Sequence, residues 1–160
     1  MGGTLRPARA GRLARGRAGA GRTLVQVGDR VTLSPRAEQL VGKPLLAIIG
    51  TRQGDGSVQM NPAWFEYRDG YFWLNSHTRR AWPRNLLRDR AVSILVVDKD
   101  NDGYWVRVDG RLVESSTERA LEHINQLSLR YSGEPFRALE PGEQRIMFKV
   151  EPVHIAGEGI

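Results

Sequence analysis

The chain has 160 residues, 40% hydrophobic and 26% charged, a composition typical of one globular domain with a substantial core. It has no cysteine, which excludes disulfides, thiolate metal sites and a cysteine nucleophile, and no apolar run of about 18 residues, which excludes a transmembrane helix. Its net charge of +6 comes from the first 22 residues, which hold six of the 24 basic residues and no acidic one. The remainder has 18 basic and 18 acidic residues, so the high pI is no evidence of nucleic-acid binding.

Residues 1–22 consist almost entirely of Gly, Ala and Arg. They hold too little apolar surface to offset the entropy of ordering, so we expect a disordered arm over residues 1–22 and a single domain over residues 23–160. The arm has three interpretations: a segment that binds phosphate backbones or an anionic membrane, a solvated tail, or a stretch upstream of the true start. It lacks the apolar segment of a secretory signal. We expect a cytoplasmic protein whose folded part binds neither nucleic acid nor membrane.

The first half of the folded region is predicted to form a helix and three strands. Ser34 has the side chain of an N-cap, Pro35 suits the first helical turn, and Gly42 ends the helix. Strands are expected over residues 45–51, 58–67 and 71–76. Because Pro62 cannot donate to a sheet ladder, the second strand is predicted to lie at an edge or to carry a bulge where Asn61-Pro62 interrupts it, which leaves backbone groups free for a ligand.

The second half is predicted to form two helices and three strands. A helix is expected within residues 77–89, and strands are expected over residues 91–98, 104–114 and 146–150. Asp109-Gly110 predicts a bulge in the middle one of these strands. The longest helix should precede the last strand, where Ser115 and Glu118 stand at capping-box spacing. Six strands with one principal helix indicate a mainly β (α+β) fold, a small antiparallel barrel.

The residue types commonly used in catalysis are sparse. Three histidines are present, His77, His123 and His154, and none has a partner at metal-ligand spacing. The order of residues suggests no Ser, His and acid arrangement, and there is neither a Gly-rich dinucleotide loop nor a P-loop. The sequence therefore predicts no metal site and no covalent catalysis.

A polar and basic segment lies at the junction between a predicted strand and a predicted helix. It contains Asn75, Ser76, His77, Thr78, Arg79, Arg80, Arg84 and Asn85. Amides, hydroxyls and guanidinium groups together provide the chemistry that a phosphate requires. The alternative is a solvated turn whose arginines pair with Asp89 or Glu66, and the spacing leaves both interpretations open.

Aromatic residues are interleaved with this segment. They are Trp64, Phe65, Tyr67, Tyr71, Phe72, Trp73 and Trp82. Such residues stack on a planar ligand in some proteins and form the core or a dimer interface in others, and the pattern does not decide between these roles.

Three stretches carry a resemblance to a known family. They are IIGTRQGDGSVQMNPAWFEYRDGYFWLNS, RRAWPRNLLRDRAVSILV and YWVRVDGRLVE. Over about residues 36–155 the chain resembles the pyridoxamine 5'-phosphate oxidase-like split-barrel superfamily, and within it the branch of flavin- and deazaflavin (F420)-dependent oxidoreductases. The resemblance implies a six-stranded antiparallel split β-barrel with a few flanking helices. It also implies a homodimer with the cofactor at the subunit interface.

The resemblance further implies which residues bind the cofactor. Those beside the ring system would be Asn61, Pro62, Ala63 and Trp64. Those around the ribityl and phosphate groups would be Asn75, Ser76, Thr78, Arg79, Arg80, Arg84 and Asn85. In such enzymes the cofactor itself carries out hydride transfer, so no catalytic residue is predicted.

Two residues depart from the family pattern. Trp82 stands where a Lys is usual, and Arg90 stands where a Pro is common. The lost Lys contact is either replaced by Arg79 or Arg80, or Trp82 narrows the site and alters or abolishes cofactor binding. We expect an oxidoreductase that transfers a hydride between reduced coenzyme F420 and a small conjugated organic acceptor. FMN is the alternative cofactor, and a non-catalytic flavin-, haem- or tetrapyrrole-binding protein is the alternative function.

Overall fold

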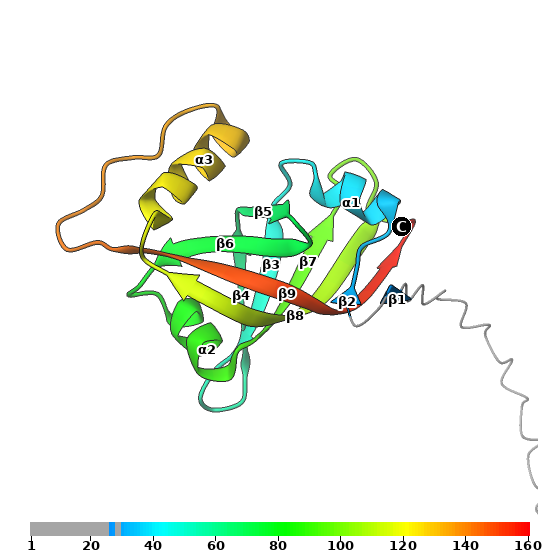
Figure 1. The fold of residues 1–160 in the computed structure, drawn as a ribbon, viewed down its shortest axis with the longest axis horizontal. Helices are drawn as coiled ribbons and strands as arrows, with labels where there is room; N and C mark the ends of the chain where they lie inside the picture. The colour runs from blue at the N-terminus through cyan, green and yellow to red at the C-terminus, as the bar shows by residue number, and fades with distance from the viewer. Residues whose placement is uncertain (1–25, 28–29) are drawn as a thin grey trace, which may run out of the picture.

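The computed structural model describes residues 26–27 and 30–160, so the arm predicted over residues 1–22 lies outside the described residues. The described residues form three helices and nine strands (Figure 1). The helices are α1 (Pro35–Val41), α2 (Ala81–Asp89) and α3 (Ala120–Ser132). The strands are β1 (Gln26–Val27), β2 (Arg30–Val31), β3 (Ala47–Arg52), β4 (Val58–Ala63), β5 (Phe65–Arg68), β6 (Tyr71–His77), β7 (Ala91–Val97), β8 (Trp105–Ser116) and β9 (Arg145–Glu158). None of these helices is long and apolar enough to cross a membrane.

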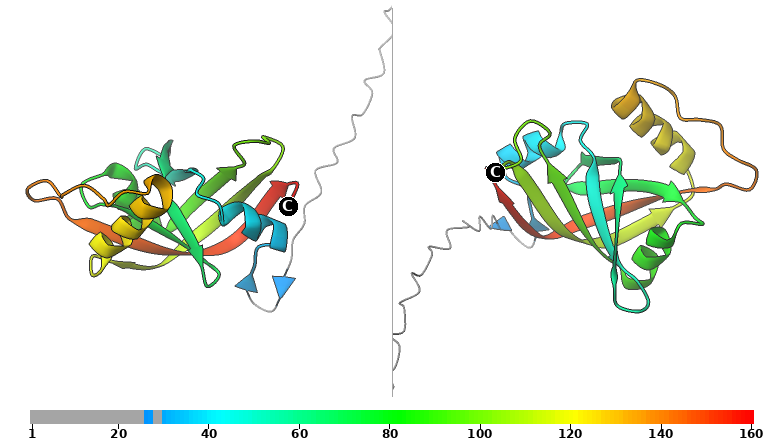
Figure 2. Two further views of the ribbon diagram at one scale, coloured as in Figure 1. Left: turned by 90° about the horizontal axis from the view of Figure 1, so that it is seen from above. Right: turned by 180° about the vertical axis from the view of Figure 1, so that it is seen from behind.

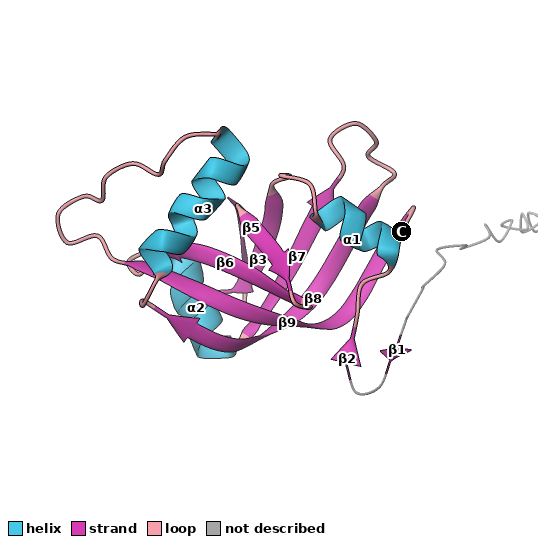
Figure 3. Ribbon diagram, turned by 45° about the horizontal axis from the view of Figure 1, so that its top comes forward, coloured by secondary structure: helices cyan, strands magenta, loops and turns pink. Residues whose placement is uncertain are grey.

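Seven of the described strands form one antiparallel sheet in the order β4-β3-β7-β8-β9-β6-β5 (Figure 3). β4 and β5 are its two edges, although only Trp64 separates them in the chain. The chain itself therefore joins one edge of the sheet to the other, and the sheet curves into a split barrel. The short strands β1 and β2 pair with each other and were not predicted from the sequence.

The structure has seven strands in this sheet, where six were predicted, because the strand predicted over residues 58–67 is divided at Trp64. The predicted interruption at Asn61-Pro62 was wrong, since the β3–β4 pairing continues through both residues. The prediction that Pro62 lies on an edge strand is confirmed. An edge strand tolerates proline because its outer side needs no N–H donor.

The longest strands, β8 and β9, bend at the predicted bulge. Their register shifts between Asp109 and Gly110. A Cβ atom at Gly110 would lie 2.4 Å from Val150 Cγ1 and 3.3 Å from the carbonyl oxygen of Glu151. Glycine is therefore required for the two strands to approach this closely.

The interior of the barrel is one hydrophobic core, in which Phe65, Phe72 and Phe148 are fully buried. α1 packs against β5, β7 and β8, and its start is confirmed as predicted, because Ser34 Oγ accepts a hydrogen bond from Ala37 N at 3.1 Å. α2 packs against β3, and α3 packs against β6 and β9. The end of α3 meets the end of α1, where Arg130 Nη2 donates to the carbonyl of Gly42 at 2.7 Å. The loop that follows α3 lies at the end of the molecule away from the C-terminus (Figure 2).

α3 begins later than predicted. Ser115 belongs to β8, and the helix starts at Ala120 after Arg119, which adopts a left-handed conformation with φ 57°. Glu118 N donates to Ser116 Oγ at 3.0 Å within the connecting turn. The predicted capping box was therefore wrong, because β8 extends through the proposed cap.

Candidate functional site

A cavity of about 370 Å³ opens where the barrel is split, between the ends of β4 and β6, the start of α2, the inner side of α3 and the loop of residues 133–144. It is lined by Leu46, Pro62, Ala63, Trp64, Asn75, Arg80, Trp82, Ile124, Phe136, Arg137 and Arg145. Apolar and aromatic groups are thus combined with three guanidinium groups. A planar ligand that carries an anionic substituent requires this combination.

Five of the eleven residues predicted to bind a cofactor line this cavity. They are Pro62, Ala63, Trp64, Asn75 and Arg80. The fold therefore brings part of the predicted ring-binding group close to part of the predicted phosphate-binding group. The other six, which do not line it, are Asn61, Ser76, Thr78, Arg79, Arg84 and Asn85.

Three of these six residues are turned into the protein. Asn85 is buried, and its Nδ2 lies 3.3 Å from both Thr51 Oγ1 and Gln59 Oε1, which fixes α2 to the β3–β4 hairpin. Ser76 is fully buried on the core side of β6. Its Oγ and Asn61 Oδ1 are buried without a hydrogen-bond partner among the described residues. Asn85 thus has a structural role, whereas Ser76 and Asn61 keep unpaired polar atoms.

The three arginines of the predicted phosphate-binding segment are exposed, and among the described residues none of them pairs with Asp89 or Glu66. Asp89 is engaged by Arg52 at 3.3 Å and by Arg88 at 2.9 Å instead. The alternative interpretation, a solvated turn whose arginines pair with Asp89 or Glu66, therefore lacks its ion pairs. Arg80 is the one of the three that reaches the cavity.

The aromatic wall of the cavity is rigid. Trp64 stacks on Tyr131 of α3, with ring centroids 5.3 Å apart and planes inclined by 15°. Tyr131 Oη donates to the carbonyl of Leu45 at 2.8 Å and accepts from Phe65 N at 3.3 Å. Burial raises the pKa of Tyr131, so its hydroxyl remains a donor at neutral pH. One face of Trp64 is thus occupied by the protein itself, and the ring is fixed in place.

The cationic wall is organised around Arg145, which is only 7% exposed. Its Nε donates to Asn75 Oδ1 at 2.9 Å, and its Nη1 lies 3.5 Å from Glu143 Oε1. Glu143 also pairs with Arg137 at 2.8 Å. Arg80 has no ion-pair partner among the described residues, so one acid faces three cations and the cavity keeps a positive charge.

Arg137 and Arg145 were not predicted from the sequence, because they lie far along the chain from the polar segment of residues 75–85. The pairing of β6 with β9 sets Arg145 opposite His77 and so brings it beside Asn75. One signal was available, since Arg145 alternates with Ile146 in the closing strand and therefore lies on its outer face. Strand order was needed to place that face beside the polar segment.

Glu143 is expected to make the stability of the loop over the cavity depend on pH. Hydrogen bonds from Arg137 and from Glu140 N, with a further contribution from Arg145, lower the pKa of Glu143 to about 2. The unfolded carboxyl has a pKa of about 4.5, so the stabilisation is complete above that pH and is lost as the pH falls towards 2. In urea unfolding, the parent should lose more stability between about pH 5 and pH 3 than Glu143→Gln does.

Asp89, whose pKa is lowered to about 2 chiefly by Arg88, titrates over the same interval. It is present in both proteins, so the difference between them isolates Glu143. Equal losses of stability in the parent and in Glu143→Gln would contradict the assignment.

The chain has recognisable relatives. A family model described as pyridoxamine 5'-phosphate oxidase matches residues 33–157. A solved F420 reductase is 24% identical, with 78% of this chain and 98% of that chain covered and a TM-score of 0.71. A conserved hypothetical protein from Mycobacterium tuberculosis is 21% identical, with 82% and 87% covered and a TM-score of 0.61. HupZ of Group A Streptococcus is 18% identical, with 81% and 100% covered and a TM-score of 0.55.

No curated protein matches the chain. At identities of 24% and below, the likeness to these solved structures shows the fold alone.

Proposed function

The chain belongs to the pyridoxamine 5'-phosphate oxidase family, and from this premise we propose that it is a cytoplasmic oxidoreductase that transfers a hydride between reduced coenzyme F420 and a small conjugated organic acceptor. One observation carries the proposal: the cavity at the split of the barrel joins an aromatic wall to three arginines. The similarity to an F420 reductase is consistent with this choice of cofactor.

The residues of the cavity fit a cofactor with a ring system and an anionic tail. Trp64 offers a fixed apolar surface, while Arg80, Arg137 and Arg145 face the single acid Glu143. A charge-assisted hydrogen bond contributes about 1.5–3 kcal/mol, so two or three such bonds would hold the tail firmly. The bound cofactor supplies the hydride chemistry. The protein orients the ring, binds the tail and excludes water.

FMN is the second candidate cofactor. Three guanidinium groups against one carboxylate leave two positive charges, which match a dianionic phosphate monoester as well as they match an extended anionic tail. A non-catalytic flavin-, haem- or tetrapyrrole-binding protein is the other candidate. It is favoured by Trp82, which lines the cavity without offering a charge.

We extend the proposal to a homodimer with the cofactor at the subunit interface. The outer face of β3, β4 and β7 is uncovered by any described helix (Figure 2, right) and forms an apolar groove of about 480 Å³. Val58 and Met60 in this groove are 65% and 63% exposed. Leu46 and Pro62 follow on at the rim of the cavity, so a second copy on the groove would also cover the cavity.

The decisive experiment is a titration of F420 and FMN, separately, into the parent, Arg80→Gln and Arg79→Gln. Arg80→Gln should bind the preferred cofactor about 10- to 100-fold more weakly, because it removes an unpaired guanidinium from the cavity. Arg79→Gln makes the same change of charge one residue away but outside the cavity, and should bind like the parent.

A colourless purified protein that quenches added F420 fluorescence supports F420, whereas a yellow protein that releases flavin on denaturation supports FMN. Steady turnover of the reduced cofactor with any acceptor excludes the non-catalytic alternative. Equal affinity of Arg80→Gln and the parent for both cofactors would contradict the proposal that this cavity binds the cofactor.

A further inference from the structure

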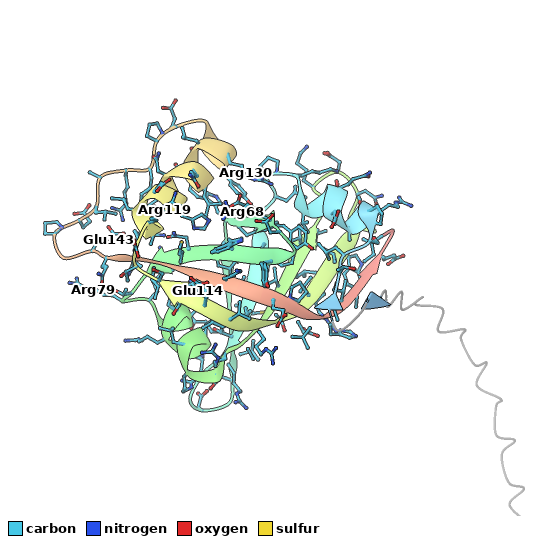
Figure 4. The ribbon with its side chains drawn as sticks, in the orientation of Figure 1. Arg68, Arg79, Glu114, Arg119, Arg130 and Glu143 are labelled. Atoms are coloured by element: carbon cyan, nitrogen blue, oxygen red, sulfur yellow. The ribbon has the colours of Figure 1, made fainter. Side chains whose placement is uncertain are left out.

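A second, smaller cavity of about 170 Å³ lies beneath α3, outside the candidate site. Arg119 and His123 line it from the first turns of α3, and Arg68 and Trp73 line it from β5 and β6. Figure 4 labels Arg119 at the start of α3 and Arg68 between α3 and the sheet. Two chain segments that are distant in sequence thus place basic and aromatic side chains around one space.

The hydrogen bonds of Asn75 determine the tautomer of His123. Asn75 Oδ1 accepts from Arg145 Nε, so its Nδ2 is the group that lies 3.1 Å from His123 Nδ1 and donates to the carbonyl of Ala120 at 2.8 Å. His123 Nδ1 must therefore accept, which leaves the proton on Nε2. Burial, together with Arg68 and Arg145, lowers the pKa of His123 to about 4, so the ring is neutral at pH 7.

His123 is 6% exposed, and its Nε2–H is a buried donor without a hydrogen-bond partner among the described residues. The same is true of Trp73 Nε1–H, on the other wall of the cavity. Arg68 lies over the Trp73 ring at 5.0 Å, and its two ion pairs, with Glu66 and Asp69, are both 3.8 Å long. Three neighbouring donor groups therefore lack a hydrogen-bonded acceptor.

The nearby acids do not satisfy these donors. Glu66 Oε2 lies 3.7 Å from His123 Nε2, too far for a hydrogen bond. Glu122 is held by Arg119 through two hydrogen bonds of 2.9 Å. Lys149 Nζ adds another cation 5.3 Å from the Trp73 ring. Glu122 and Gln126 also line the cavity, but among the described residues neither forms a hydrogen bond with His123 Nε2 or Trp73 Nε1.

We propose that the cavity beneath α3 binds a small oxyanion, a phosphate or a carboxylate, through Arg68, His123 Nε2–H and Trp73 Nε1–H. Its volume of about 170 Å³ accommodates one such anion with a few waters. Drug-sized ligands and cofactors occupy roughly 300–1,000 Å³, so this is a separate site for a smaller ligand. The inference does not depend on the proposed function, because none of these three residues lines the first cavity.

The test is a titration of inorganic phosphate and, separately, acetate into the full chain, at constant ionic strength held with chloride. The probe is the indole N–H signal of Trp73 in 15N-labelled protein, assigned from the spectrum of Trp73→Phe. We expect this signal to shift with a Kd of about 1 mM or lower for the better anion. The stronger of the two anions identifies the ligand class as phosphate or carboxylate.

Arg68→Gln should bind at least about tenfold more weakly, since it removes the charge-assisted contact. Arg111→Gln is the matched control: an exposed strand arginine that lines neither cavity, and it should bind like the parent. Glu66→Gln should bind more tightly, because it removes the nearest competing acid.

The proposal fails if Arg68→Gln and the parent bind equally well, or if neither anion shifts the Trp73 signal up to roughly 20 mM. It also fails if Glu66→Gln binds phosphate while the parent does not, because Glu66 would then occupy the cavity in the native chain. Arg68 is half exposed, so its replacement should leave the fold intact and the comparison interpretable.

Discussion

Trp82→Ala is expected to lower the free energy of unfolding by about 3–5 kcal/mol. Trp82 is 2% exposed and belongs to the barrel core, where its ring centroid lies 5.5 Å from that of Phe148. Alanine would leave a void in the core beside Phe148, next to the cavity that Trp82 lines. Urea unfolding followed by circular dichroism measures the change as a lower midpoint with an unchanged slope.

Trp82→Phe is the matched control, since it keeps an aromatic ring in the core and should cost no more than about 1–2 kcal/mol. Trp82→Lys, which restores the residue usual in the family, should be destabilised about as much as Trp82→Ala, because it also loses the contact with Phe148. A midpoint for Trp82→Ala within experimental error of the parent would show that Trp82 does not support the fold. Trp82, the residue that departs from the family pattern, is thus part of the hydrophobic core.

Arg145→Gln is expected to weaken binding of the proposed cofactor, F420 or FMN, about 10- to 100-fold. Its guanidinium is fixed by Asn75 and Glu143 before any ligand arrives, so little entropy is lost on binding. Removing this positive charge leaves Glu143 less compensated beside the cavity, which adds repulsion to the lost attraction. Fluorescence titration of the cofactor at two salt concentrations measures the effect.

Arg111→Gln again serves as the control, because it removes the same charge outside the cavity and should leave the affinity unchanged. Urea unfolding of Arg145→Gln shows whether the variant is folded under the binding conditions. A folded Arg145→Gln that binds as tightly as the parent would mean that the anionic group lies elsewhere.

Local chemistry made much of the fold predictable. Ser34 caps α1 and Pro62 lies on an edge strand as predicted, because both consequences follow from the residue's own hydrogen-bonding groups. The division at Trp64 was not predictable in this way, since it depends on which strands meet across the barrel. Ser115 has the local sequence of a helix cap, but it pairs with β9 as part of β8 instead.

The candidate site was also predictable only in part, because strand pairing brings some of its residues together. Arg80 lies in a polar segment whose composition suits a phosphate or a solvated turn, and the family resemblance implied Pro62 to Trp64. Arg145 joins them only because β9 pairs with β6, a contact between residues about seventy positions apart. Asn85 has the right chemistry for a ligand, but the β3–β4 hairpin uses it.

Trp64 joins the two edges of the sheet, and this affects how the barrel could open. A fully closed barrel has no free edges, but no described strand pair links the edge strands β4 and β5, and the seam between them is bridged by one residue of main chain, Trp64. Widening this seam would break no pairing between the described strands, because none of these pairings crosses it. Trp64 also stacks on Tyr131 and lines the cavity, so the residue that bridges the seam also forms part of the cavity wall. Widening the cavity at this seam would therefore disturb the Trp64–Tyr131 stack and would leave the pairing of the sheet unchanged.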